Sequence, residues 1–416
     1  MNVLIKSATI IDAKSDFHNA THDILIEKGA ISKIAKSIKN PKNYKEIKLD
    51  NLHVSQGWFD SSVCFGEPGF EDRETIINGL KTAAKSGFTS VALQANTCPV
   101  IDCNSDVSFI KSKAQHHAVS LMPVGALTKN SEGVALAELF DMQNAGAVAF
   151  SDYKRPIINP NLLKIALQYA SNFGGLVCSF PQENKIAGNG VMNEHVTSTN
   201  LGLKGNPNLA EALQVARDLY ILEYTGGKLH IPTISTVEAV DLIRAAKQKK
   251  LDITCSVAIH NLFMDDTELK EFDTRFKVLP PLRTQNDIEA LIEGVNDGTI
   301  DMVTSDHNPL TIEDKKIEFD YATYGTIGLE SAFGALQNLF TTKKTIKLLT
   351  NGKARFSLEN SIIKEGALAN MTLFNPDGKY TFTADRIVSK SKNSIFLDRE
   401  LKGKVYGIIA NNKIEL

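Results

Sequence analysis

The stretch DSSVCFGEPGFED, from Asp60 to Asp72, carries polar side chains where an apolar strand ends and a Glu-Pro-Gly turn follows. Cys64, as a thiolate, is a candidate zinc ligand or nucleophile, whereas the neutral hydroxyl of Ser62 is a poor ligand. No histidine lies beside Cys64 to activate it, and a free cysteine is more often a small buried apolar side chain. The stretch therefore indicates either a metal site with unusual ligands or a site that has lost its metal.

A second candidate is TSDHNPL, in which Asp306 and His307 are adjacent. They are either a working acid–base pair or a structural remnant in which Asp306 accepts hydrogen bonds from nearby backbone and hydroxyl groups. We favour the remnant, because an isolated carboxylate does little hydrolysis. His230 lies within an apolar run and is typical of a hydrogen-bonded core histidine. His260 directly follows an apolar run in AIHNLF and is a candidate lining residue.

These residues belong to a regular alternation of apolar β-branched runs and helical patterns between residues 57 and 309. The runs span residues 57–63, 88–95, 118–124, 147–152, 175–180, 228–234, 252–257 and 300–306. Strands that are apolar on both faces and alternate with helices indicate a parallel sheet covered on both sides. Eight such units favour closure into a (β/α)₈ TIM barrel over a doubly wound open sheet.

The two ends of the chain follow a different pattern of short alternating segments separated by turns. We expect Val3 to Ile5 and Tyr406 to Ile409 to be interior strands. The pattern predicts a barrel at residues 55–350 and one small β-sandwich domain built from residues 1–54 and 351–416.

Composition excludes several classes of protein. The formal net charge is only −2, so no overall basic field attracts nucleic acid or a membrane surface. The five cysteines include no CxxC pair and do not resemble a disulfide framework. No apolar run approaches the roughly 20 residues of a membrane helix, and the first residues do not resemble a signal peptide. We expect a cytoplasmic protein.

Several blocks, in order, resemble the dihydroorotases of the longer bacterial class, within the amidohydrolase superfamily. They include GWFDSSVCFGEPGFED, TGGKLHIPTIST, VLPPLRTQNDIEALIEGVNDGTIDMVTSDHNP and GTIGLESA. The resemblance covers nearly the whole chain and implies a barrel of the amidohydrolase type. It also implies a reaction, the opening or closing of a cyclic amide by a metal-activated water, with an aspartate that transfers the proton.

The family's site residues are largely replaced in this sequence. By the resemblance, four histidine ligand positions hold Ser62, Cys64, Phe180 and Thr233. The substrate-clamping arginine corresponds to Gly66 and a substrate-contacting histidine to Leu310, while the bridging-ligand position falls on Asp152 or Tyr153. Asp306 keeps the catalytic carboxylate and Asn96 the carboxylate-binding asparagine, and His307 and His260 are further candidates for substrate binding.

These replacements predict a protein that holds no divalent metal tightly. We expect a non-catalytic dihydroorotase-like pseudoenzyme of pyrimidine biosynthesis, a homo-oligomer that serves as a scaffold partner of aspartate transcarbamoylase, with no cofactor. One alternative is an active dihydroorotase or related cyclic amidohydrolase that uses zinc in a rearranged site. Another is a sensor that binds an anionic pyrimidine precursor through Asn96.

Overall fold

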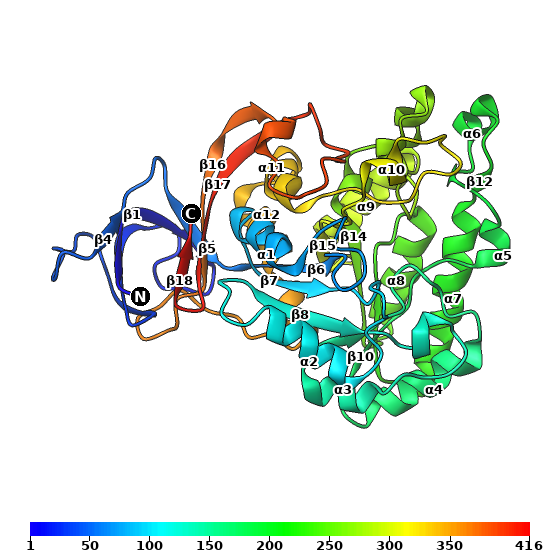
Figure 1. The fold of residues 1–416 in the computed structure, drawn as a ribbon, viewed down its shortest axis with the longest axis horizontal. Coiled ribbons are helices and arrows are strands. Elements are labelled where there is room, and N and C mark those ends of the chain that lie inside the picture. Colours follow the sequence, from blue (N-terminus) through cyan, green and yellow to red (C-terminus); the bar gives the residue numbers. More distant parts are fainter.

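The computed structural model describes residues 1–416 as a barrel joined to one mixed sheet (Figure 1). Eight parallel strands follow one another around the barrel in chain order. They are β6 (Trp58–Val63), β7 (Phe88–Leu93), β8 (Ser120–Gly125), β9 (Ala149–Phe150), β10 (Leu176–Cys178), β13 (Lys228–Ile231), β14 (Ile253–Ala258) and β15 (Met302–Thr304). Each apolar run of the sequence overlaps one of these strands, so the (β/α)₈ prediction is confirmed.

The barrel closes between its first and last strands through a buried carboxylate. Asp60 in β6 is 1% exposed. One of its oxygens accepts hydrogen bonds from the Thr304 hydroxyl (2.6 Å) and the Ser62 amide (2.9 Å), and the other accepts from the Ser305 amide (2.8 Å). A backbone bridge between Val63 and His307 extends the same seam. The Asp60 side chain therefore closes the barrel between β6 and β15, where the backbone pairing is short.

Helices follow the strands and cover the outside of the barrel (Figure 1). The main ones are α1 (Ile76–Lys85), α2 (Asn104–Lys113), α3 (Leu139–Ala145), α4 (Pro160–Ser171), α7 (Asn208–Thr225), α8 (Val237–Gln248), α9 (Gln285–Asp297), α11 (Leu329–Leu339) and α12 (Thr342–Thr350). Their starts are set by side-chain caps: Thr75, Thr236 and Thr284 each accept a hydrogen bond from the backbone amide three residues later.

Shorter elements lie in the segments after β10, β14 and β15. They are α5 (Asn184–Ala187), β11 (Met192–Asn193), α6 (Val196–Leu201), β12 (Gly205–Asn206), the 3₁₀ turns η2 (Ile259–Leu262) and η3 (Asp266–Glu271), and α10 (Ile312–Lys315). In a TIM barrel the segments after the strands surround the mouth at which ligands bind.

An apolar plug fills the other end of the barrel. Phe356 follows the short helix α13 (Gly352–Arg355) and packs inside the barrel, with its ring centroid 5.2 Å from that of Phe59 and 5.8 Å from that of His230. Ala92, Val124, Ala149, Leu176, Cys178 and Met302 complete this cluster. This cluster makes the interior apolar at that end of the barrel, up to the floor of the polar cavity.

Both termini meet in a single mixed sheet at one side of the barrel (Figure 1). Its strands are β1 (Val3–Ile11), β2 (Thr21–Glu27), β3 (Ala30–Ala35), β4 (Lys45–Ile47), β5 (His53–Gln56), β16 (Met371–Thr381), β17 (Glu400–Ala410) and β18 (Lys413–Glu415). The order is β18-β17-β16-β5-β1-β2-β3, with β4 beside β1. Trp58 at the start of β6 is fully buried, and its ring centroid lies 5.8 Å from that of Phe374 in β16, a contact that joins the sheet to the barrel.

The domain boundaries proposed from the sequence stay predictions. No helix in the structure combines the length and the apolar character needed to cross a membrane.

Replacing Asp60 tests the seam that closes the barrel. Asp60→Ala leaves two buried backbone amides without an acceptor and leaves the Thr304 hydroxyl only the Ser62 carbonyl at 3.4 Å, so we expect a loss of about 3 kcal/mol in the free energy of unfolding. Urea denaturation measures it. Asp72→Ala, at an exposed carboxylate later in the same segment, is the matched control and should change stability by less than about 0.5 kcal/mol. Equal stabilities of the two variants would contradict this account of closure.

Candidate functional site

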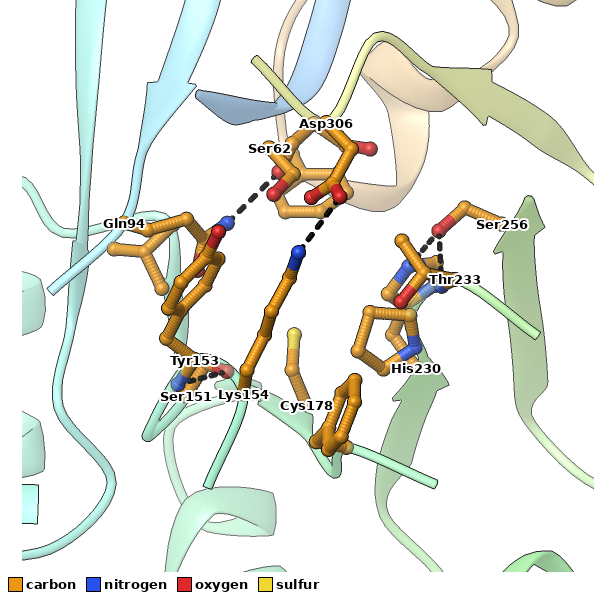
Figure 2. A pocket seen from close by; sticks show the side chains of 15 residues that line it. Ser62, Gln94, Ser151, Tyr153, Lys154, Cys178, His230, Thr233, Ser256 and Asp306 are labelled. Carbon is orange, nitrogen blue, oxygen red and sulfur yellow. Dashed lines mark hydrogen bonds and ion pairs between the residues drawn. The ribbon is translucent and has the colours of Figure 1, made fainter. Parts of the chain in front are cut away.

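A small cavity lies where the barrel strands end (Figure 2). It offers about 20 Å³ to the centre of a water molecule, which is room for about one water. The lining comes from all parts of the barrel: Ser61, Ser62, Gln94, Val124, Ser151, Tyr153, Lys154, Cys178, Phe180, His230, Pro232, Thr233, Ser256, Asp306 and Phe356. The structure therefore gathers the sequence candidates Ser62, Phe180, Thr233 and Asp306 around one point.

An ion pair spans this cavity. Lys154, four residues after β9, places Nζ 2.7 Å from Oδ2 of Asp306, two residues after β15 (Figure 2). Their side chains are 11% and 2% exposed. Burial raises the pKa of Asp306 above its ordinary value, and the Lys154 ammonium opposes this rise by charge and by hydrogen bonding. The Asp306 carboxylate is therefore already neutralised by a cation from the chain itself.

Tyr153, which precedes Lys154, also points into the cavity, whereas Asp152 does not. The Asp152 carboxylate accepts hydrogen bonds from the amides of Leu127 and Thr128 and from the Thr128 hydroxyl (2.9, 2.9 and 2.5 Å). Of the two candidates for the bridging position, Tyr153 lines the cavity and Asp152 holds the β8 loop. Sequence reasoning missed Lys154, whose only signal was its place just beyond the fourth apolar run.

Cys64 lies in this region as a protonated thiol. It is 2% exposed, and burial raises its pKa to about 12. Tyr153, Asp306 and Lys154 are close enough to influence the pKa of this thiol. A thiol with this pKa supplies neither a nucleophile nor a thiolate ligand near neutral pH.

The three candidate histidines are all buried, and burial lowers the pKa of each to about 3. Nδ1 of His230 lies 2.9 Å from the Thr254 hydroxyl and Nε2 lies 3.3 Å from the Ser256 hydroxyl, so both ring nitrogens have partners. His307 accepts hydrogen bonds at Nδ1 from the first amides of α11. His260 lies in η2 and is absent from the cavity lining. Only His230 of the three touches the cavity.

Three strand ends around the cavity have left-handed backbone conformations. Tyr153, Thr233 and Asp306 have φ angles of 56°, 48° and 48°. Side chains with Cβ atoms adopt this region at a cost of roughly 1–3 kcal/mol each, and such strain concentrates at functional sites. All three side chains line the cavity, so the backbone at these positions directs them inward.

A larger pocket lies outside the cavity, with a volume of about 700 Å³. Asn96, Arg155 and Leu310 line it, and Tyr153 and Lys154 line both spaces and so separate them. The side-chain oxygen of Asn96 is buried without a partner. Arg155 donates to the carbonyls of Asn130 and Ser131.

Gly66 is fixed by the turn it occupies. Its φ is +65°, and a Cβ atom there would lie 2.3 Å from the carbonyl oxygen of Phe70. The turn therefore excludes any larger side chain, including an arginine.

The side chains at the barrel centre do not fit a divalent metal. Around Asp306 the ligand positions offer hydroxyl groups, a protonated thiol and the ring of Phe180, and the ammonium of Lys154 would repel a cation. The one group of three acidic or thiol side chains with closely spaced ligand atoms is Asp102, Cys103 and Asp106, at the start of α2 and outside this cavity.

Comparison with known proteins agrees with this fold. Residues 53–239 match the family model described as Dihydro-orotase-like. A dihydroorotase of Geotalea daltonii is 38% identical over 100% of this chain and 99% of its own length. A dihydroorotase of Thermoanaerobacter sp. is 40% identical over 100% of this chain and 97% of its own length.

Solved structures extend the likeness at the level of the fold. An L-hydantoinase (dihydropyrimidinase) of Arthrobacter aurescens superposes with a TM-score of 0.85 at 19% identity, over 99% of this chain and 95% of the other. A D-hydantoinase of Thermus sp. gives a TM-score of 0.82 at 20% identity, over 99% of this chain and 94% of the other. With the full-length likeness to dihydroorotases, the chain belongs to the dihydroorotase-like family.

Proposed function

We propose that this member of the dihydroorotase-like family is a non-catalytic protein of pyrimidine biosynthesis that acts as a scaffold for aspartate transcarbamoylase. The observation that carries the proposal is the Lys154–Asp306 ion pair at 2.7 Å, which holds a cation of the protein against the retained carboxylate. Hydrolysis of a cyclic amide needs an activated water and a carboxylate free to take its proton. Asp306 is engaged with an ammonium instead.

The dimensions of the cavity beside Asp306 also support a non-catalytic role. The space beside Asp306 has room for about one water, whereas a six-membered cyclic amide needs many times that volume. The outer pocket is large enough for such a ligand, but Tyr153 and Lys154 stand between it and the space beside Asp306. A substrate bound outside would meet an ammonium and a phenol rather than a water poised for attack.

The rest of the molecule supports a role that depends on shape. The alignment with the relative from Geotalea daltonii runs over 421 residues and covers both chains almost completely. The barrel, its helical layer and the terminal sheet are all present. A scaffold requires a folded surface but no catalytic residues, because catalysis depends on the residues of the site whereas assembly depends on those of the surface. The family resemblance makes aspartate transcarbamoylase the proposed partner.

Metal content and turnover test the loss of catalysis directly. We expect purified protein incubated with zinc and then dialysed to contain far less than one equivalent, because the ligand positions lack imidazoles and Lys154 repels the ion. Elemental analysis by mass spectrometry measures zinc, and absorbance assays follow dihydroorotate hydrolysis and its reverse.

The dihydroorotase of Geotalea daltonii, handled identically, is the positive control. Stoichiometric zinc together with turnover that Asp306→Asn abolishes would establish instead an active cyclic amidohydrolase with a rearranged site.

Substitutions at the ion pair test whether Lys154 replaces a metal in balancing Asp306. Lys154→Met removes the cation and leaves the buried Asp306 carboxylate without a partner. We therefore expect the free energy of unfolding at pH 7 to fall by about 3–5 kcal/mol. The double variant Lys154→Met/Asp306→Asn removes both charges and should recover most of that loss. Chemical denaturation of the wild type and of the single and double variants gives the coupling energy. A Lys154→Met variant as stable as the wild type would contradict the role of the pair.

Assembly tests the scaffold role. Mixed with aspartate transcarbamoylase from the same organism, the protein should co-elute in size-exclusion chromatography with light scattering, at a fixed stoichiometry. The Lys154→Met/Asp306→Asn variant should assemble equally well, because the barrel centre takes no part in contacts between proteins. Ornithine transcarbamoylase is the control that should not co-elute. Separate elution of the two proteins at tens of micromolar would reject this partner.

A further inference from the structure

A pocket of about 490 Å³ lies between the antiparallel strand pair β16–β17 and the barrel helices α1 and α11. Strand β17 packs on both helices, and Figure 1 shows the strand pair beside α11. No residue that lines this pocket also lines the cavity beside Asp306 or the larger pocket outside that cavity. Ligands bind preferentially in concave spaces of this size, where two parts of a fold meet and apolar walls carry a few polar groups. This space, the sheet–helix pocket, is therefore a candidate binding site separate from the barrel centre.

Aromatic side chains form the walls of the sheet–helix pocket. Phe333 of α11 and Phe382, just after β16, are each 2% exposed, and the half-buried ring of Tyr380 lines the same space. The Tyr380 hydroxyl lies 3.0 Å from the position that a Cβ atom would take at Gly334, and no hydrogen bond of the structure engages it. A glycine in the middle of α11 thus leaves room for this hydroxyl. Aromatic walls with a free hydroxyl favour a planar ring that carries hydrogen-bonding groups.

A carboxylate that lines this pocket lacks a hydrogen-bond donor. Oε1 of Glu330, in the first turn of α11, accepts hydrogen bonds from the backbone amides of Val388 and Ser389, whereas Oε2 is buried without a partner. Burial raises the pKa of Glu330 to about 7, although the two amides oppose the rise. Glu330 lies four residues before Gly334, so its side chain and the Tyr380 hydroxyl are on the same face of α11. An N–H donor from a ligand would supply the missing partner.

Cations without a carboxylate partner also line the pocket. The Arg386 guanidinium lies over the Tyr380 ring, 4.8 Å from its centroid, and forms no ion pair. Lys404 is likewise free of ion pairs. Of the two other carboxylates in the lining, Asp377 accepts a hydrogen bond from an asparagine side chain and Asp50 is exposed to solvent. A guanidinium held against an aromatic ring can bind a phosphate through two parallel hydrogen bonds. The ligand therefore carries an anionic group as well as an N–H donor.

We propose that the sheet–helix pocket binds a nucleoside monophosphate, with the base between the aromatic walls beside Glu330 and the phosphate at Arg386. Every common base has a flat face for stacking and an amino or ring N–H group for the carboxylate. The volume of about 490 Å³ is sufficient for the base, the ribose and the phosphate. The site lies outside the barrel centre. Its test is therefore independent of whether Asp306 is catalytic and of whether the protein serves as a scaffold.

Isothermal titration calorimetry of the full chain with AMP, CMP, GMP and UMP tests this site at pH 8, where the Glu330 carboxylate is charged. At least one of the four should bind at one per chain, with a dissociation constant below about 100 µM. Arg386→Ala should raise that constant about tenfold or more, because it removes the phosphate contact. Arg399→Ala, at an exposed arginine outside the pocket, is the matched control and should bind as the wild type does. Circular dichroism should show that both variants keep the fold.

Partial ligands and a second variant separate the base from the phosphate. The corresponding nucleoside and inorganic phosphate should each bind at least tenfold more weakly than the nucleotide. Glu330→Gln keeps an oxygen for the two backbone amides but replaces Oε2 by a donor, so it should weaken both the nucleotide and the nucleoside. Arg386→Ala should weaken the nucleotide alone. The proposal is overturned if none of the four nucleotides binds, if inorganic phosphate binds as tightly as the nucleotide, or if Arg386→Ala and Glu330→Gln leave the affinity unchanged.

Discussion

The ion pair between Lys154 and Asp306 determines what the centre of this barrel can do. A carboxylate that is 2% exposed needs a positive partner, because a lone charge in the interior is strongly disfavoured. In a metal hydrolase that partner is a divalent ion, which also activates water. Here the partner is an ammonium on a flexible stem. It satisfies the carboxylate but has no open coordination position for a water, so the proposed function rests on an electrostatic need that is met without a metal.

Most of the fold follows from the sequence because it depends on patterns that extend over many residues. Eight apolar runs alternating with helical segments were sufficient to predict a closed parallel barrel, and each run overlaps a strand of the structure. The closure itself was not predictable at the level of residues. Asp60 appeared as the end of a strand, but its hydrogen bonds to Thr304 and Ser305 join segments 244 and 245 residues apart. No local pattern reports contacts at that distance.

The site was predicted less completely, since it depends on single residues in turns. The segment AFSDYKRP contains three candidates in succession, and sequence spacing cannot tell which side chain faces inward. The left-handed φ of Tyr153 settles this in the structure by directing Tyr153 and Lys154 to the cavity and leaving Asp152 with the β8 loop.

The turn at Gly66 bears on whether this barrel could acquire a substrate-clamping side chain at that position. A new side chain at that position would collide with the Phe70 carbonyl and would also have to hold a left-handed backbone angle. A single codon change to arginine would therefore damage the loop before it could contribute any recognition of a carboxylate. The loop would first have to be rebuilt, so the turn acts as an evolutionary ratchet that a point mutation at Gly66 alone does not reverse.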